Sequence, residues 1–266
     1  MSQQAAPMLD TEQIAQFNEL GYLVLPAFLP PALVARLEPE VDHWVDSGLR
    51  ADSIAACRDA ESLQPPPVME IELPAHGELV AHPPLMWLLD QLMGRDFVFH
   101  HLHSVRLAPD APGKSWHHDY EQPAGRGRSH LMVHALHYLG GLDASQGGLA
   151  LLPGSHREQA EKAARARLGC AELPGEVLVN DLPRGSTVLI HSALFHTRRP
   201  PRVTGGEANR PRYLVDGSYC RTGVRWQPVK PYWRHMLSRA RDLGLDHGQW
   251  PELFSDQHFT EYADPS

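Results

Sequence analysis

Cysteine is scarce in this sequence. Among its 266 residues there are three cysteines, Cys57, Cys170 and Cys220, which lie far apart and show no C-x-x-C spacing. Such a set does not form the disulfide framework of a small secreted domain. We expect three reduced thiols with structural roles.

Long apolar runs are absent too. No stretch approaches the roughly 20 consecutive apolar residues of a membrane span, and residues 1–10 lack the basic and apolar regions of a signal peptide. The composition, with 42% hydrophobic and 21% charged residues, is ordinary for a soluble globular protein with one sizeable core. We therefore expect a cytoplasmic protein without a membrane partner.

The chain also lacks an excess of positive charge. Its formal net charge is -8, which argues against a general nucleic-acid binder, because such proteins usually carry a basic face. Lysine occurs only three times, whereas five arginines crowd into one short stretch (Arg198, Arg199, Arg202, Arg210 and Arg212). The first three of these either belong to a solvated loop or attract an anionic substrate, and the sequence favours neither reading.

The N-terminal part of the chain has helical patterns around one short strand. Residues 11–18 predict a helix capped by Asp10 or Thr11, and residues 21–26 predict a strand. A second helix begins at Pro30-Pro31 and has apolar residues at helical spacing (Leu33, Val34, Leu37, Val41 and Trp44). We expect a loop over residues 49–68, which show no period, and a helix over residues 84–93.

From residue 96 onward, short strands separated by turns predict an all-β sandwich or barrel. The expected strands are residues 97–107, 131–139, 148–152, 177–180, 186–191 and 212–219. Between them, residues 158–168 are rich in Ala, Glu and Arg and predict an inserted helix. A last helix is expected over residues 232–242. We expect one domain over residues 1–266, with a helical part at about 10–95, a β core at about 96–222 and an extension at about 223–266.

The most specific local feature is the pair His117 and Asp119. The two residues are two positions apart at the end of an extended segment, and side chains at that spacing share one face of a strand. A histidine and an aspartate projected together supply two of the three ligands of a 2-His-1-carboxylate facial triad, which leaves open positions on Fe(II). The third ligand should be a distant histidine near the end of a later strand. His196 and His191 both meet that description.

Several segments in order resemble the phytanoyl-CoA dioxygenase family of Fe(II)/2-oxoglutarate-dependent oxygenases, which includes the ectoine hydroxylases. The resemblance covers most of the chain, and several motifs in one order are stronger than any single His-x-Asp pair. The motifs are Phe17 to Pro26, Trp116 to Asp119, Gly147 to His156 and Gly185 to His196.

The resemblance implies a double-stranded β-helix, a cupin-like jelly roll with flanking N-terminal helices. It implies iron ligands at His117, Asp119 and His196, which settles the choice against His191, and it implies 2-oxoglutarate and O2 as cosubstrates. It also places an arginine on the far carboxylate of 2-oxoglutarate, through two parallel hydrogen bonds. Arg212 is our choice and Arg210 is the alternative, with an inserted loop at residues 200–208.

The chain departs from the family pattern at two places. The family commonly follows the distal histidine with Gly-Ser, where the serine helps hold 2-oxoglutarate, but here the chain reads Thr197-Arg198. Thr197 can supply a hydroxyl from the neighbouring position. In addition, Leu107 lies near a place that the family often fills with lysine.

The other histidines carry weaker expectations. His118 should point away from its two ligand neighbours, and the Gly147 to His156 segment fits a fold signature better than a catalytic one. Of the histidines on strands, one or two are expected to meet substrate and the rest to be core or surface residues (His101, His103, His130, His134 and His137).

The function that follows is hydroxylation of an unactivated C–H bond of a small, possibly anionic molecule, with release of succinate and CO2. Radical halogenation is disfavoured because Asp119 fills the position that a halide would need. Two rivals stay open: a cupin-type metalloenzyme that uses the same three residues without 2-oxoglutarate, and a non-catalytic jelly-roll binding module.

Overall fold

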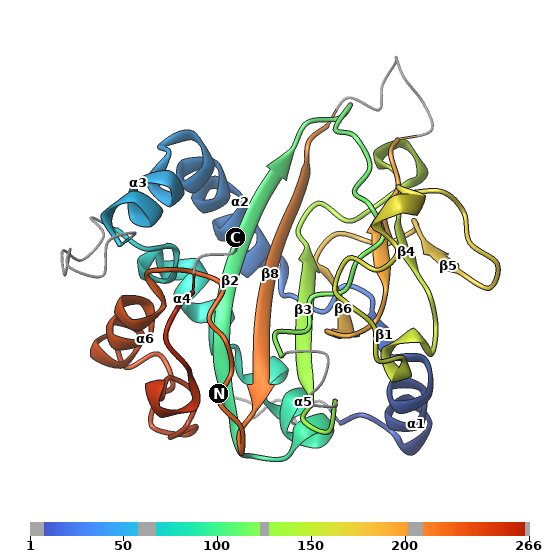
Figure 1. The fold of residues 1–266 in the computed structure, drawn as a ribbon. Coiled ribbons are helices and arrows are strands. Elements are labelled where there is room, and N and C mark those ends of the chain that lie inside the picture. Colours follow the sequence, from blue (N-terminus) through green and yellow to red (C-terminus); the bar gives the residue numbers. More distant parts are fainter. Residues whose placement is uncertain (1–7, 58–67, 123–127, 202–209, 264–266) are drawn as a thin grey trace.

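The computed structural model describes residues 8–57, 68–122, 128–201 and 210–263. Eight strands form two antiparallel sheets, in the orders β1-β6-β3-β8-β2 and β5-β4-β7 (Figure 1). The strands of the larger sheet are β1 (Tyr22–Leu25), β6 (Ser186–His191), β3 (Met132–Tyr138), β8 (Arg212–Arg221) and β2 (Phe97–Leu107). Those of the smaller sheet are β5 (Val177–Val179), β4 (Leu149–Leu151) and β7 (His196–Arg198). The expected double-stranded β-helix with flanking helices is confirmed.

The N-terminal helices largely follow the sequence pattern. Helix α1 (Thr11–Leu20) begins after Asp10, whose carboxylate accepts from the backbone N–H of Gln13 at 2.8 Å in a capping box. Gly21 ends it with a backbone φ of 86°, a conformation that glycine adopts without steric cost. Helices α2 (Pro31–Asp46) and α5 (Pro83–Met93) lie where they were predicted.

Two further helices were not expected. Helix α3 (Leu49–Ala56) occupies the first part of the predicted loop, and α4 (Pro74–Val80) precedes α5. Helix α3 buries only Ser53, so it has no apolar stripe for a sequence pattern to detect. The C-terminal helix α6 (Trp233–Asp242) agrees with the prediction. No helix among the described residues is long and apolar enough to cross a membrane.

The predicted inserted helix at residues 158–168 is wrong. The segment folds as turns and a single 3-10 turn at Ala166–Leu168. One carbonyl inside the segment and one just after it pair with another part of the chain: that of Lys162 accepts from the backbone N–H of His118 at 3.1 Å, and that of Gly169 accepts from the N–H of Trp116 at 2.9 Å. Tertiary pairing to the 116–118 segment therefore replaces the internal hydrogen bonds of a helix.

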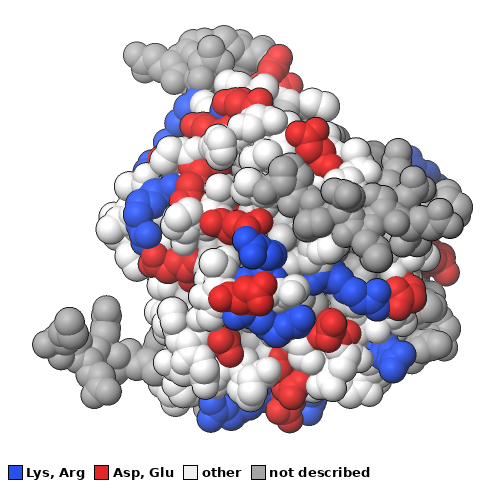
Figure 2. Space-filling model, turned by 90° about the vertical axis from the view of Figure 1, so that its left-hand side faces the viewer, with Lys and Arg blue, Asp and Glu red and all other residues white. Residues whose placement is uncertain are grey.

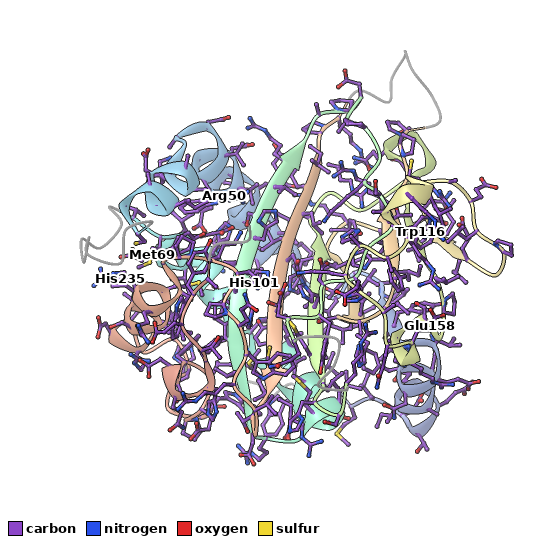
Figure 3. The ribbon with its side chains drawn as sticks, viewed as in Figure 1. Arg50, Met69, His101, Trp116, Glu158 and His235 are labelled. Atoms are coloured by element: carbon purple, nitrogen blue, oxygen red, sulfur yellow. The ribbon has the colours of Figure 1, made fainter. Side chains whose placement is uncertain are left out.

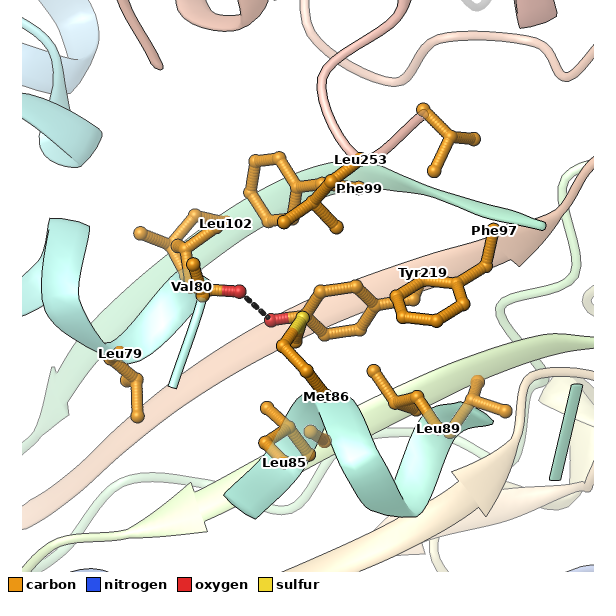
Figure 4. Close-up of a cluster of buried hydrophobic side chains, with 14 of the residues drawn as sticks. Leu79, Val80, Leu85, Met86, Leu89, Phe97, Phe99, Leu102, Tyr219 and Leu253 are labelled. Atoms are coloured by element: carbon orange, nitrogen blue, oxygen red, sulfur yellow. Dashed lines mark hydrogen bonds between the residues drawn. The ribbon is translucent and has the colours of Figure 1, made fainter. Parts of the chain in front are cut away.

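The larger sheet has one face toward the helices and one toward the smaller sheet. On the helix side, Tyr219 of β8 packs among apolar residues and donates its hydroxyl to the carbonyl of Val80 at 2.8 Å (Figure 4). On the other side, Leu136 and Tyr138 of β3 pack with Leu149 and Leu151 of β4. Because side chains alternate along a strand, this second face also carries every other residue of β8, beginning at Arg212.

A buried polar chain ties the helices to the sheet. Glu40 of α2 lies 2.8 Å from His76 Nδ1, and His76 Nε2 lies 3.0 Å from the hydroxyl of Ser104 on β2. The order of these groups is that of a hydrolase triad, but His76 and Ser104 are both 0% exposed. No substrate can reach Ser104, so these three hydrogen-bonded side chains have a structural role.

Charges of both signs are mixed on the face that carries α3 and α6. Figure 2 shows acidic and basic side chains side by side there, with no broad basic surface among the residues drawn in colour. Several of them are paired, for example Arg106 with Asp42 at 2.6 Å and Arg239 with Glu72 at 2.7 Å. This face gives no support for a nucleic-acid partner.

Buried neutral histidines should make the fold sensitive to acid. His137 is buried against Thr187 at 2.8 Å, and burial, helped by the charge of His82, lowers its pKa from 6.5 to about 3. Below pH 6.5, His137 binds a proton in the unfolded chain but stays neutral in the folded chain. The free energy of unfolding therefore decreases as the pH falls from 6.5 toward 3. At pH 5 this loss amounts to about 2 kcal/mol for His137.

The change that tests this is His137→Gln, followed by urea unfolding at pH 7.5 and pH 5. The variant should lose about 2 kcal/mol less than the wild type between the two pH values. An identical loss in both proteins would assign the acid sensitivity to other groups.

Candidate metal centre

The structure brings His117, Asp119 and His196 together, with their ligand atoms within 4.8 Å of one another. His117 and His196 form an isolated antiparallel bridge, in which the N–H of each donates to the carbonyl of the other at 3.1 and 2.8 Å. Asp119 is tied to Ser192 by a backbone hydrogen bond of 2.7 Å. These backbone contacts, made between segments about 80 residues apart in the sequence, hold the three side chains in place.

The two imidazoles are oriented as metal ligands usually are. His117 Nδ1 lies 2.7 Å from the carbonyl of Ser115, and His196 Nδ1 lies 3.0 Å from that of Leu194. A carbonyl only accepts, so each Nδ1 carries the proton and each Nε2 presents a lone pair. These Nε2 atoms lie 3.7 and 3.2 Å from the Asp119 carboxylate oxygens. Ligands about 2.1 Å from one ion lie roughly 3 Å apart, so the donor set fits a metal.

The electrostatics favour the ligand forms of the same residues. Burial, together with the charge of His196, lowers the pKa of His117 to about 3, so its ring is neutral near pH 7. Burial alone would raise the pKa of Asp119, but its contacts with the neighbouring imidazoles outweigh this and hold the pKa well below its ordinary value, so the carboxylate is ionised. The Nε2 atom of His117 is buried without a hydrogen-bond partner, which a bound cation would satisfy.

His191 does not join this group. Its Nδ1 accepts from the backbone N–H of Ala193 at 3.0 Å, and its ring stacks on Tyr120 at 6.1 Å between centroids. It also contacts His156, whose Nε2 lies 3.2 Å from the carbonyl of Asn18. Both histidines therefore stabilise the fold around the site, as the sequence suggested for His156.

Arg212 lies on the inner face of β8 with an incompletely satisfied guanidinium. It is 5% exposed, and its Nη2 donates to the hydroxyl of Tyr138 at 3.1 Å. Its Nε and Nη1 are buried without a hydrogen-bond partner, and no carboxylate of the described residues forms an ion pair with it. Arg210, the alternative, is exposed and pairs with Asp143 at 2.9 Å.

Thr197 and Arg198 lie on opposite faces of β7. The hydroxyl of Thr197 donates to the carbonyl of Lys114, so it can only accept a further hydrogen bond, which a carboxylate cannot offer. Arg198 shares a small hollow with Arg212, and burial together with the charge of Arg212 lowers its pKa. The predicted contact of Thr197 with 2-oxoglutarate stays a prediction, and the cation of β7 that lies beside Arg212 is Arg198.

Two of the three arginines that could attract an anionic substrate already form contacts within the protein. Arg198 donates to the carbonyl of Pro112 at 2.7 Å, and Arg199, which is 9% exposed, pairs with Glu176. Arg202 and most of the predicted 200–208 loop lie outside the described residues. Arg199 thus has a structural role.

A second polar group lies on the inner face of the larger sheet. It comprises His101 of β2, His134 of β3 and Asp216 of β8, with ligand atoms within 4.8 Å. Figure 3 shows His101 near the middle of the sheet and Trp116 toward the smaller one. His134 Nδ1 lies 2.8 and 2.9 Å from the two oxygens of Asp216. Asp216 was not among the predicted site residues, although it lies four residues from Arg212 along β8 and must therefore share its face of the strand.

A hollow of about 170 Å³ opens beside the metal-ligand segment. Its lining residues are His118, Tyr120, Glu121, Gln122, Arg128, Ala160, Glu161, Lys162 and Gln227. His118 lines it and is held in place by the carbonyl of Ala160, 2.9 Å from its Nε2. Glu121 pairs with Lys162, and burial raises its pKa. The hollow therefore lies beside the ligand segment and is lined there by His118 and Tyr120, the two neighbours of Asp119 in the sequence.

Comparisons with known proteins agree with this geometry. The sequence profile of the phytanoyl-CoA dioxygenase (PhyH) family matches residues 17–202. A curated relative, the dioxygenase trt7 of Aspergillus terreus, is 26% identical over 244 residues, which cover 86% of this chain and 78% of that protein.

Solved structures share the fold at lower identity. The carbocyclase SnoK of nogalamycin biosynthesis, which depends on α-ketoglutarate, has a TM-score of 0.61 and 16% identity, covering 85% of this chain and 89% of its own. HygX of Streptomyces hygroscopicus, solved with nickel, 2-oxoglutarate and hygromycin B, has a TM-score of 0.60 and 20% identity, with coverages of 82% and 90%. At these identities the likeness shows the fold.

Proposed function

The chain belongs to the phytanoyl-CoA dioxygenase family, and from this premise we propose that it is an Fe(II)- and 2-oxoglutarate-dependent dioxygenase acting on a small organic molecule. The proposed reaction hydroxylates one C–H bond. Substrate, 2-oxoglutarate and O2 give the alcohol, succinate and CO2, so that one oxygen atom enters the alcohol and the other enters succinate.

His117, Asp119 and His196 would hold the iron. Their buried lone pairs and ionised carboxylate form the 2-His-1-carboxylate set that suits non-haem Fe(II) and leaves positions for small ligands. When bound, iron with 2-oxoglutarate and O2 supplies the oxidising power for attack on a C–H bond. The backbone carbonyls of Ser115 and Leu194 keep both rings in the ligating tautomer.

The observation that carries the proposal is the buried guanidinium of Arg212, whose Nε and Nη1 have no hydrogen-bond partner and which forms no ion pair with a carboxylate of the described residues. A buried charge without a partner lowers the stability of the fold. Its presence is explained where a ligand of opposite charge binds to it. Arg212 donates to Tyr138 and lines one small hollow together with Arg198 and Arg210. A carboxylate of 2-oxoglutarate would accept hydrogen bonds from the free Nε and Nη1 atoms.

The remaining residues would position the substrate and exclude water. The 116–118 segment is covered by the turns near Lys162 and Gly169, and Trp116, which is 0% exposed, packs with Ala150 and Phe195. These contacts keep bulk water from the ligand segment. The hollow beside Asp119 would take the organic substrate, with Glu121 and Lys162 as its charged lining.

The proposal is tested by succinate formation. Purified protein is loaded with Fe(II), given ascorbate and 2-oxoglutarate under air, and incubated with a broad panel of small molecules, while succinate and a product 16 mass units heavier than the substrate are measured together. We expect both from at least one compound. Metal bound by His117, Asp119 and His196 without any succinate above background would favour the cupin-type enzyme that does not use 2-oxoglutarate.

A product of unchanged mass, or one 2 units lighter, would replace hydroxylation by epimerisation or by ring formation. Both outcomes are plausible chemistry for this fold, since solved relatives include an epimerase and a carbocyclase.

A further inference from the structure

We propose that His134, held by Asp216, binds the carboxylate of 2-oxoglutarate that lies next to its oxo group and the iron. His134 and Arg212 would then bind the two ends of the same molecule. This inference rests on the proposed function and assigns to the cosubstrate site a residue that the sequence pattern left among several strand histidines.

The first observation is an unsatisfied atom. His134 is 1% exposed, and its Nδ1 is engaged by both oxygens of Asp216, yet its Nε2 is buried without a hydrogen-bond partner. Buried polar atoms are nearly always paired. The described part of the chain thus leaves unsatisfied polar atoms at two places on one sheet face, at Arg212 and at His134.

The second observation is the register of the two strands that carry them. In the β3–β8 pair, Tyr138 lies opposite Leu214, Leu136 opposite Asp216 and His134 opposite Ser218. Residues opposite one another share a face, so His134 and Asp216 lie on the same inner face as Tyr138 and Arg212. His134 lies opposite Ser218, which is six residues from Arg212 along β8, so His134 and Arg212 are about 20 Å apart along the sheet at roughly 3.3 Å per residue.

That separation suits the cosubstrate. A five-carbon dicarboxylate together with the reach of an arginine side chain fills such an interval, and the leucines between the ends, Leu136 and Leu214, would contact its methylene groups. The backbone N–H of Asp119, a proposed iron ligand, donates to the carbonyl of Ser192 at 2.7 Å, and the N–H of Ser192 donates to that of Met132, two residues from His134, at 2.8 Å. The His134 end of the interval is therefore the end near the metal.

The charges around His134 favour a donor. Burial alone would lower its pKa, but Asp216, Asp119 and Glu121 face it and raise the pKa overall. The facing ring of His101, whose own pKa is held well below its ordinary value by burial, is neutral and leaves His134 as the charged member of the pair. An imidazolium that gives Nδ1–H to Asp216 has Nε2–H left for a carboxylate.

Two 2-oxo acids separate the two ends of the site. Pyruvate has the carboxylate and oxo group of 2-oxoglutarate but lacks the far carboxylate. Binding of each acid is measured without oxygen by calorimetry and by the visible absorption that appears when a 2-oxo acid chelates Fe(II), on His134→Leu, Asp216→Asn and Arg212→Met proteins loaded with Fe(II).

We expect His134→Leu to weaken both acids by about 10- to 100-fold, the usual loss for one hydrogen bond to a charged group. Asp216→Asn should weaken both by a smaller factor, because it leaves the ring in place without its anchor. Arg212→Met should weaken 2-oxoglutarate by about 100-fold and leave pyruvate unchanged.

Controls keep the outcomes separate. Each variant should bind one iron per chain and keep the wild-type near-ultraviolet circular dichroism; Asp216→Asn serves if His134→Leu does not fold. Unchanged binding of both acids by folded His134→Leu overturns the inference. A second iron that the wild type binds and this variant loses overturns it too, because His101, His134 and Asp216 would then be a metal site. A wild type that binds iron but neither acid contradicts the proposed function instead.

Discussion

Replacing His196 by alanine should abolish metal binding and, with it, all succinate formation. The Nε2 atom of His196 lies 3.2 Å from an Asp119 oxygen, and its backbone is paired with His117 on both sides, so no other side chain of the described residues can take its place. Even partners outside the first ligand sphere are worth about 10- to 100-fold in metal affinity. Loss of a direct ligand should exceed that range, measured as iron per chain after dialysis.

His191→Ala is the matched control for that experiment. The two histidines are five positions apart, and both were possible third ligands from strand position alone. Because His191 caps the backbone N–H of Ala193 and stacks on Tyr120, its loss should lower stability but leave one iron bound. Iron retained by His196→Ala and lost by His191→Ala would reverse the ligand assignment.

Replacing Arg212 by methionine should change affinity and stability in opposite directions. Truncating one partner of a buried, hydrogen-bonded charge pair costs about 3 kcal/mol, so 2-oxoglutarate should bind more than about 100-fold more weakly. In the absence of ligand the same guanidinium is buried with two unpaired nitrogens. Its removal should therefore leave the melting temperature of the ligand-free protein unchanged or raise it.

Arg210→Met controls for charge. Arg210 is exposed and forms a surface pair with Asp143, and such pairs contribute about 0–1 kcal/mol. We expect wild-type affinity for 2-oxoglutarate from this variant. A drop in affinity for Arg210→Met with none for Arg212→Met would exchange their roles. A lower melting temperature of ligand-free Arg212→Met would mean that this arginine supports the fold.

The opposite signs expected for Arg212 follow from its unsatisfied nitrogens. By contrast, the buried polar groups from Glu40 through His76 to Ser104 satisfy one another. On the inner face of β3 and β8, Nε and Nη1 of Arg212 and Nε2 of His134 have no hydrogen-bond partner among the described residues. Unsatisfied donors lower stability, and a ligand that satisfies them gains the corresponding affinity.

The sequence by itself determined the parts that depend on local chemistry. The cap at Asp10, the period of α2 and the short runs of strand-forming residues in β2 and β6 fix those elements within a few residues, because capping and burial act locally. His117 and Asp119 were readable as a pair since strand geometry places side chains two apart on one face.

Only the tertiary structure decided what depends on contacts between distant segments. The 158–168 segment lost its helix because carbonyls near it pair with the 116–118 backbone. His196 rather than His191 faces Asp119 because of one backbone bridge to His117, and Arg198 rather than Thr197 shares the hollow of Arg212 because β7 turns that face inward. Helical and strand patterns report which side of an element is buried, but not which partner it meets there.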